Sequence, residues 1–388
     1  MRLYFKKLYK NKGSWLPIGV FVLAVLLVLV MNTRVGAERN LEGMEREDLA
    51  TNKEALVLNQ QSLESAQTQE EKEAFAEGIK ISEAHIEKQQ KIIDSYSSGN
   101  WSEAYKIKIG FIKEASELYN EDMPDYSYIK ESNLREVAIY TQLMKLDIKS
   151  DQEDLETQGA TFLYRMLASF FPVFFIVVLC FTLNISFTDR FYNHLDRSLL
   201  LPQKYVKGTS QRLLFGFLVA VTLYVMSCLL AYLSASMLSG AGSFEYPIAV
   251  ERKAEFVTMP VGGLLVKAMT LQILAIIVVV LTVDLVSKLC KRVMSTLFVS
   301  LLILVVPVVA VGKIVPLNIW AEFLPGTYFN AVSVVDNSLA ILCDNAGIHF
   351  SNGVLVLVVT TIVLLILNFG IDSRRSKVVN LNADMKTT

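Results

Sequence analysis

The sequence predicts an all-α membrane protein with six transmembrane helices and one large helical domain between the first and second of them. Six apolar stretches support this fold class, at residues 15–31, 162–185, 213–238, 263–286, 293–311 and 354–369. Each meets or approaches the ~20 residues that a helix needs to cross the ~30 Å hydrocarbon core of a bilayer. The polar stretch at 35–160 is far longer than an ordinary connection, so we expect it to fold as a domain outside the membrane.

The first apolar stretch could also be the core of a cleavable signal peptide, because several basic residues precede it. Against this, the run is long and Met31-Asn32-Thr33-Arg34 offers no small-x-small cleavage site, although Val35-Gly36-Ala37 lies just beyond. We therefore predict that residues 15–31 remain in the protein as its first span.

Charge is distributed unevenly along the chain and predicts the orientation. Of 37 Lys and Arg and 38 Asp and Glu residues, 15 basic and 27 acidic side chains lie at 33–160. The remaining basic excess lies in alternate connections, namely the N-terminus, residues 187–212, the turn at 288–292 and the C-terminal tail. Since cytoplasmic connections carry the excess of Lys and Arg, we predict a multi-pass protein of a bacterial plasma membrane, with both termini cytoplasmic and the acidic domain outside.

The acidic domain is expected to contain four helices, near 38–63, 69–97, 102–119 and 128–148. Two capping-box spacings mark helix starts and one Ser-Ser-Gly sequence marks a helix end: Thr68 with Glu71, Asn100 with Glu103, and Ser97-Ser98-Gly99. We expect a long hairpin or small bundle whose first and last helices run into spans one and two. The domain contains no cysteine, so it depends on packing for its stability.

An apolar stripe at helical spacing runs along the second of these helices, at Phe75, Ile79, Ile86 and Ile93. We interpret this stripe as internal core. A partner-binding coiled coil is the alternative, but the repeat is not sustained over enough heptads to favour it.

Motifs for catalysis and for autonomous energy use are absent from the sequence. There is no G-x-x-x-x-G-K-[ST] loop for nucleotide phosphates, and no Gly-x-Ser-x-Gly or His-Glu-x-x-His pattern. The four cysteines and three histidines are scattered, which argues against a metal site. No carboxylate lies in the middle of an apolar stretch, where ion-coupled carriers usually need one. We expect no enzyme activity, no metal and no cofactor in this chain.

The segment after the second span is predicted to be an amphipathic surface helix. Apolar side chains recur four residues apart on one face, at Phe187, Phe191, Leu195 and Leu199, and Arg190, Asp196 and Arg197 occupy the other face. The helix is expected to end at Leu199-Leu200-Leu201-Pro202, before a basic link that leads to span three through Arg212. A helix that only anchors on anionic lipid would have the same pattern.

In these features the chain resembles the permease subunits of type 2 ABC transporters. That family has a coupling helix after span two with a Leu-Leu-x-x-Pro-like end, which residues 187–202 match in position and form. It also has short re-entrant helices with a Leu-Pro-x-x-Tyr element between spans five and six, and this chain has Leu324, Pro325 and Tyr328 there. The resemblance covers the chain apart from the large insert, which belongs to some subgroups only.

The resemblance implies a membrane-spanning subunit of an ATP-driven exporter. A separate ABC ATPase would bind ATP and dock on residues Phe187, Arg190, Phe191, Leu195, Arg197, Leu199 and Pro202. The permease would form the substrate pathway as a homodimer or with a second permease. The substrate could be an antimicrobial peptide or drug, and the acidic domain would attract a cationic peptide. Membrane lipid is a further expected partner, whereas nucleic acid is not.

The predicted organisation starts with a cytoplasmic N-terminus and span one at 1–34, followed by the extracellular domain at 35–160. Span two follows at 161–186, and the coupling helix and basic link at 187–212. Spans three to six occupy 213–372, with an outer re-entrant segment at 313–350, and a cytoplasmic tail ends the chain at 373–388. Pro172 and Pro307 are candidate kinks in spans two and five. Two other functions stay open at this point, a non-transporting membrane sensor or scaffold with an extracellular ligand-binding domain, and a carrier of another kind.

Overall fold

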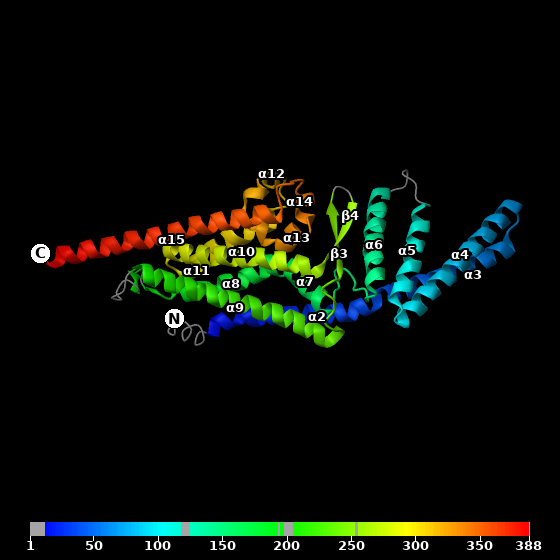
Figure 1. Cartoon of the computed structure of the whole chain (residues 1–388), viewed down its shortest axis with the longest axis horizontal. Coiled ribbons are helices and arrows are strands. Elements are labelled where there is room, and N and C mark those ends of the chain that lie inside the picture. The colour runs from blue at the N-terminus through cyan, green and yellow to red at the C-terminus, as the bar shows by residue number, and fades with distance from the viewer. Residues whose placement is uncertain (1–11, 118–124, 193–194, 198–204, 253–254, 388) are drawn as a thin grey trace. The chain divides into compact units, whose positions relative to one another are not determined.

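The computed structural model describes residues 12–117, 125–192, 195–197, 205–252 and 255–387 (Figure 1). The chain divides into two compact units. The first, which we call the membrane unit, comprises Met1–Val28, Phe162–Ser234 and Gly263–Thr388. The second, which we call the insert unit, comprises Leu29–Thr161 and Ala235–Gly262.

The long helices of the membrane unit are α2 (Lys12–Arg39), α7 (Gly159–Ser169), α8 (Ile176–Thr188), α9 (Tyr205–Ser239), α10 (Val261–Cys290), α11 (Val293–Ala310) and α15 (Phe350–Thr387). Within the described residues, six helical segments are long and apolar enough to cross a membrane. Each predicted apolar stretch overlaps one of these segments. The prediction of a helical, polytopic membrane protein is therefore confirmed.

Span two is not one continuous α-helix. A π-helical turn, η1 (Phe171–Phe175), separates α7 from α8. Pro172, one of the two candidate kink positions, lies at the start of this turn. Pro307, by contrast, lies inside α11, which continues as an α-helix to Ala310.

Five short helices connect α11 to α15, and they are α12 (Val315–Asn318), η3 (Ala321–Phe323), η4 (Pro325–Phe329), α13 (Ala331–Val335) and α14 (Ser338–Leu342). In this segment η4 packs on both α11 and α15. A Cβ added at Gly326 would lie 2.7 Å from Cβ of Pro307, so the approach of η4 to α11 requires glycine at this position.

The insert unit is built on four helices, α3 (Leu41–Ser65), α4 (Gln69–Ser97), α5 (Trp101–Glu117) and α6 (Tyr126–Leu146). Each packs on the next along the chain, and α3 and α4 lie side by side as a hairpin (Figure 1). The capping box is present, since the Glu71 amide donates to Thr68 Oγ1 and the Thr68 amide donates to Glu71 Oε2. Gly99, with φ +82°, follows the end of α4. The predicted start of α4 and the predicted break after Ser97 are confirmed.

Both junctions of the insert differ from the continuous helices that we predicted. The first is broken at Asn40, whose side chain accepts from the Gly43 amide and caps α3. The last helix, α6, ends at Leu146 because Asp147 takes a left-handed conformation (φ 49°). An irregular segment then leads to α7, and Asp151 Oδ2 orders it by accepting from the Thr157 and Gln158 amides.

A β-hairpin between α9 and α10 was not predicted. Strands β3 (Pro247–Arg252) and β4 (Glu255–Pro260) pair antiparallel, with Val250 opposite Val257, and both pack on α6. Tyr246, just before β3, donates from its hydroxyl to the Asp151 carbonyl and accepts from the Asp151 amide. The insert unit is therefore assembled from two separate parts of the chain.

The core of the insert unit lies between α4, α5 and α6 and includes Ile92, Tyr105 and Leu143, all fully buried. Of the predicted apolar stripe on α4, only Ile93 is fully buried. Phe75, Ile79 and Ile86 are half-buried, because the first half of α4 packs mainly on α3.

Candidate functional site

The segment after span two does not form the amphipathic helix that we predicted. α8 ends at Thr188, and a two-stranded hairpin follows, formed by β1 (Phe191–Tyr192) and β2 (Leu195–Asp196). The Arg197 amide closes this hairpin by donating to the Arg190 carbonyl (3.0 Å). The helical spacing of the apolar residues was misleading because Arg190 and Asp196 turn inward and form buried ion pairs. Leu199 and Pro202 lie outside the described residues.

The other predicted coupling residues differ widely in exposure. Phe187 is fully buried, and a Cβ added at Gly216 on α9 would lie 2.5 Å from its ring. Leu195 in the hairpin is 73% exposed, and Arg197 is also exposed. The guanidinium carbon of Arg190 lies over the ring of Phe191, 4.5 Å from the centroid of that ring. Leu195 is therefore an exposed apolar side chain of the hairpin, whereas Arg190 lies inside.

A cluster of buried charges lies beside this hairpin. Arg212 on α9 contacts Asp284 on α10 through Nε–Oδ1 (2.6 Å) and Nη2–Oδ2 (3.2 Å). Arg212 Nη2 also contacts Asp372 Oδ2 on α15 (3.0 Å). Lys288 on α10 reaches the same two carboxylates, at 2.9 Å from Asp284 and 2.8 Å from Asp372. Two cations and two carboxylates thus form a closed ring across three spans.

Polar groups complete this ring. Thr209 Oγ1 donates to Asp372 Oδ2 (2.5 Å), and Lys288 Nζ donates to the carbonyl and side-chain oxygen of Asn368 (3.0 and 2.9 Å). Asn368 Nδ2 in turn donates to the Leu281 carbonyl (3.1 Å). Such dense hydrogen bonding is what a buried ion pair needs to offset the loss of hydration.

The hairpin joins the ring through Arg190. Its guanidinium lies 3.6 Å from Asp196 and 3.9 Å from Asp284. We call the six charged residues Arg190, Asp196, Arg212, Asp284, Lys288 and Asp372 the charge cluster. Its three cations and three carboxylates balance, and Asp284 and Lys288 are completely buried. Because each charge of the ring needs its partners, α9, α10 and α15 are held in one arrangement at this point. The hairpin is attached to the ring by the ion pair of Arg190 with Asp284, without a hydrogen bond between the two side chains.

Sequence reasoning did not bring Asp284 and Arg212 together. The useful signal was the Asp284–Lys288 pair, four residues apart in an apolar helix, because two charges at that spacing share a face. Asp372, 88 residues further along the chain, could not be assigned to them from the sequence.

The other predicted site lies in the short-helix segment. Tyr328 is fully buried; its hydroxyl donates to the Glu322 carbonyl (2.6 Å) and accepts from Asn352 Nδ2 (2.9 Å). Burial raises the pKa of Tyr328 to about 12. Leu324 and Pro325 are half-buried at the start of η4. These contacts make Tyr328 a structural tie between η3, η4 and α15; the position of this segment relative to a membrane stays a prediction.

Within the described residues, no group of three or more His, Cys, Asp or Glu side chains is arranged to hold a metal ion. Comparisons of the chain with protein families, with curated proteins and with solved structures find no match.

Proposed function

We propose that this chain is the membrane-spanning permease subunit of an ATP-driven exporter, which pairs with a second permease, most simply another copy of itself. The observation that carries the proposal is the charge cluster, which links the hairpin to α10 through the Arg190–Asp284 ion pair and links α10 to α9 and α15 through the ring. A push on the hairpin would be transmitted to three spans at once. A lipid anchor would have no need of such a connection.

Energy would come from a separate ABC ATPase that binds ATP and docks on the hairpin. A partner can shift an equilibrium between two pathway states only if it binds them with different affinity. Among the described residues of the hairpin, Leu195 is exposed and is our candidate for that contact. In this proposal the hairpin and both termini are cytoplasmic, as the excess of basic residues in those segments predicts.

The insert unit would then lie outside the cell, where its acidic surface would attract a cationic substrate such as an antimicrobial peptide. Acidic residues outnumber basic ones by 27 to 15 at 33–160. Exposed charges of this kind increase the rate of encounter more than the final affinity. The proposed role of the insert unit is therefore capture of the substrate before export.

The docking proposal is tested by replacing Leu195 with Asp. A charge at an apolar contact should abolish co-purification with an ABC ATPase expressed from the same genome and should stop ATP-dependent transport. The matched control is Val315→Asp, which places the same charge at a 75% exposed apolar position on α12. Normal ATPase binding by the Leu195→Asp chain would refute docking on this hairpin.

A membrane sensor or scaffold is the second candidate, because the insert unit has a core of its own and could bind a ligand without transport. The two functions differ in one measurement. A permease reconstituted with its ATPase moves substrate across a vesicle membrane, whereas a sensor binds ligand and moves none.

A further inference from the structure

Span two contains a local departure from α-helix that a static membrane anchor would not need. At η1 the Phe175 amide donates to the Phe170 carbonyl (3.0 Å), a five-residue step in place of the usual four. Pro172 within the turn has no N–H and cannot donate to the preceding turn. Single π-turns inside α-helices are frequent at functional positions.

A polar side chain from another span supports this turn. Gln272 Nε2 on α10 donates to the Leu167 carbonyl in the turn before Pro172 (3.2 Å). Gln272 Oε1 accepts from the Tyr224 hydroxyl on α9 (2.8 Å). Gln272 is 3% exposed in the middle of an apolar helix, where an amide is costly to bury unless both its ends are bonded. The Gln272–Leu167 bond therefore ties α10 to span two just before the π-helical turn. We call span two with this π-helical turn the bent form.

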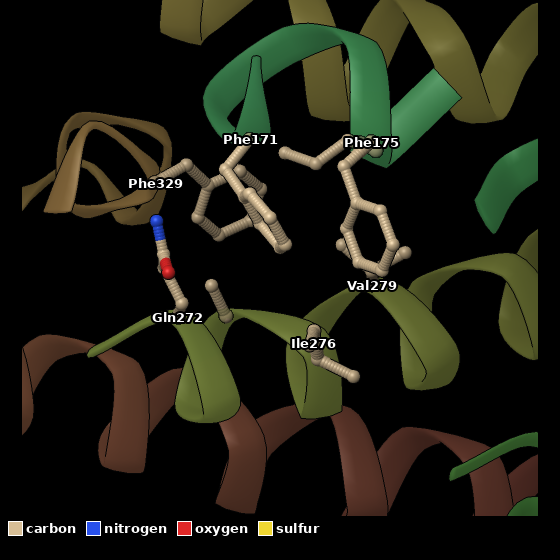
Figure 2. Close-up of a pocket in the computed structure, with 8 residues that line it drawn as sticks. Phe171, Phe175, Gln272, Ile276, Val279 and Phe329 are labelled. Atoms are coloured by element: carbon tan, nitrogen blue, oxygen red, sulfur yellow. The ribbon is translucent and has the colours of Figure 1, made fainter. Parts of the chain in front are cut away.

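A small cavity adjoins the turn. Figure 2 shows the rings of Phe171 and Phe175 projecting from η1 toward Gln272, Ile276 and Val279 of α10, with Phe329 at the side. The cavity volume is about 20 Å³, and its lining is apolar apart from Gln272. A space of this size holds about one water-sized group.

α8, the helix after η1, leads to the hairpin and makes few side-chain hydrogen bonds to the neighbouring helix α11. α8 packs on α11, and Asn184 Nδ2 donates to the Val293 carbonyl there (3.0 Å). Three buried oxygens on these two helices, Asn184 Oδ1, Thr296 Oγ1 and Ser300 Oγ, have no hydrogen-bond partner. Other span hydroxyls, such as Thr182 and Thr360, donate to the carbonyl four residues back. Few hydrogen bonds would be lost if α8 moved along α11.

We propose that η1 is a hinge in span two and that Gln272 is the positioning residue that holds it in the bent form. When η1 relaxes to α-helix, α8 moves relative to α7, by at most one residue step of about 1.5 Å along its axis and about 100° around it. α8 is a continuous α-helix of 13 residues and ends shortly before the hairpin. When the hairpin moves, span two would therefore change conformation at η1, in the middle of the membrane. This role rests on the proposed function, whereas the existence of the hinge does not.

Three substitutions should shift the equilibrium between the bent form and a straight, fully α-helical form of span two in predictable directions. Pro172→Ala supplies the missing N–H and favours straight helix. Gln272→Leu removes the donor to the Leu167 carbonyl and also favours straight helix, in which the Phe171 amide replaces that donor. Val279→Ile adds one methylene to the cavity wall and favours the bent form, because it fills the space that the rings would enter.

The test measures the distance between spin labels at Ser186 on α8 and Leu289 on α10 by pulsed electron resonance. It uses the full chain without any ATPase, with the four native cysteines replaced by alanine. We expect Pro172→Ala and Gln272→Leu to raise the population of a second distance about fivefold, the ratio that one net hydrogen bond represents. Val279→Ile should lower that population.

Two control variants match the chemistry elsewhere, Pro307→Ala in the continuous helix α11 and Val266→Ile at an exposed site on α10, and neither should change the distances. If all three test variants show the same single distance as the parent chain, the hinge proposal is wrong. If Gln272→Leu fails to fold, the other two variants decide the question. If the distances show the hinge but the chain binds no ATPase, the proposed function is wrong and the hinge proposal stands.

Discussion

Arg212 on α9 and Asp284 on α10 form a two-point ion pair inside the membrane unit, with Nε–Oδ1 at 2.6 Å and Nη2–Oδ2 at 3.2 Å. The fork of the guanidinium fits both carboxylate oxygens, a geometry that lysine cannot reproduce. Lys288 approaches Asp284 Oδ2 at 2.9 Å, so this carboxylate serves two strong partners. Asp284 is thus the centre of the charge cluster.

Replacing Asp284 with Asn should destabilise the membrane unit strongly. The change leaves the buried cations Arg212 and Lys288 with one carboxylate less, and removing one partner of a buried pair costs about 3–5 kcal/mol. Thermal unfolding of the full chain in detergent should show a large fall in midpoint. Asp344→Asn is the control, since Asp344 is exposed and its left-handed backbone suits Asn equally well. An equal midpoint for the two variants would contradict a structural role for the cluster.

The helices could be predicted from the sequence because their signals are local. Apolar length marks the spans, and the Thr68–Glu71 spacing marks the start of α4. The charge cluster could not be predicted in the same way, because Arg212 and Asp372 lie 160 residues apart and either could have faced solvent. The hairpin at 191–196 was misread for a related reason. Its helical spacing is a local signal, and the long-range pair of Arg190 with Asp284 favours another conformation.

Glu136 on α6 should contribute less to the stability of the insert unit as the pH rises through the acidic range. Burial raises the pKa of Glu136, with Glu45 and Glu153 adding to the rise and Lys108 opposing it. The folded state therefore favours the protonated acid, whereas the unfolded chain ionises near its ordinary pKa of about 4.3. The contribution of Glu136 to stability is complete below that value and is lost as the pH rises toward the folded pKa.

Glu136→Gln removes this loss. The variant should match the wild type near pH 4 and exceed it in urea midpoint at pH 7, with a difference that grows between these values. Fluorescence of Trp101 on α5 reports unfolding of the insert unit once Trp15 and Trp320 are replaced by Phe. Glu131→Gln, at an exposed site on α6, should show no such trend. A constant difference at all pH values would exclude titration of Glu136 as the cause.

The orientation of the chain is open to direct measurement. Residues 187–212 carry the basic excess and the insert unit carries the acidic excess, so the positive-inside bias predicts that they lie on opposite sides of the membrane. Single cysteines at Ser65, an exposed residue at the end of α3, and at Ser198, after the hairpin, are placed in a chain without its native cysteines.

In intact cells a membrane-impermeant thiol reagent should label the cysteine at Ser65 and not the one at Ser198. After the cells are permeabilised, both should react, which controls for accessibility of the second site. Ser198 follows Leu195 by three residues in the sequence, and the Arg190–Asp284 pair links the hairpin to α10, so the side on which Ser198 reacts is also the side from which a partner reaches Leu195. Labelling of Ser198 from outside would place the hairpin beyond reach of a cytoplasmic ATPase, and the permease proposal would fail with it.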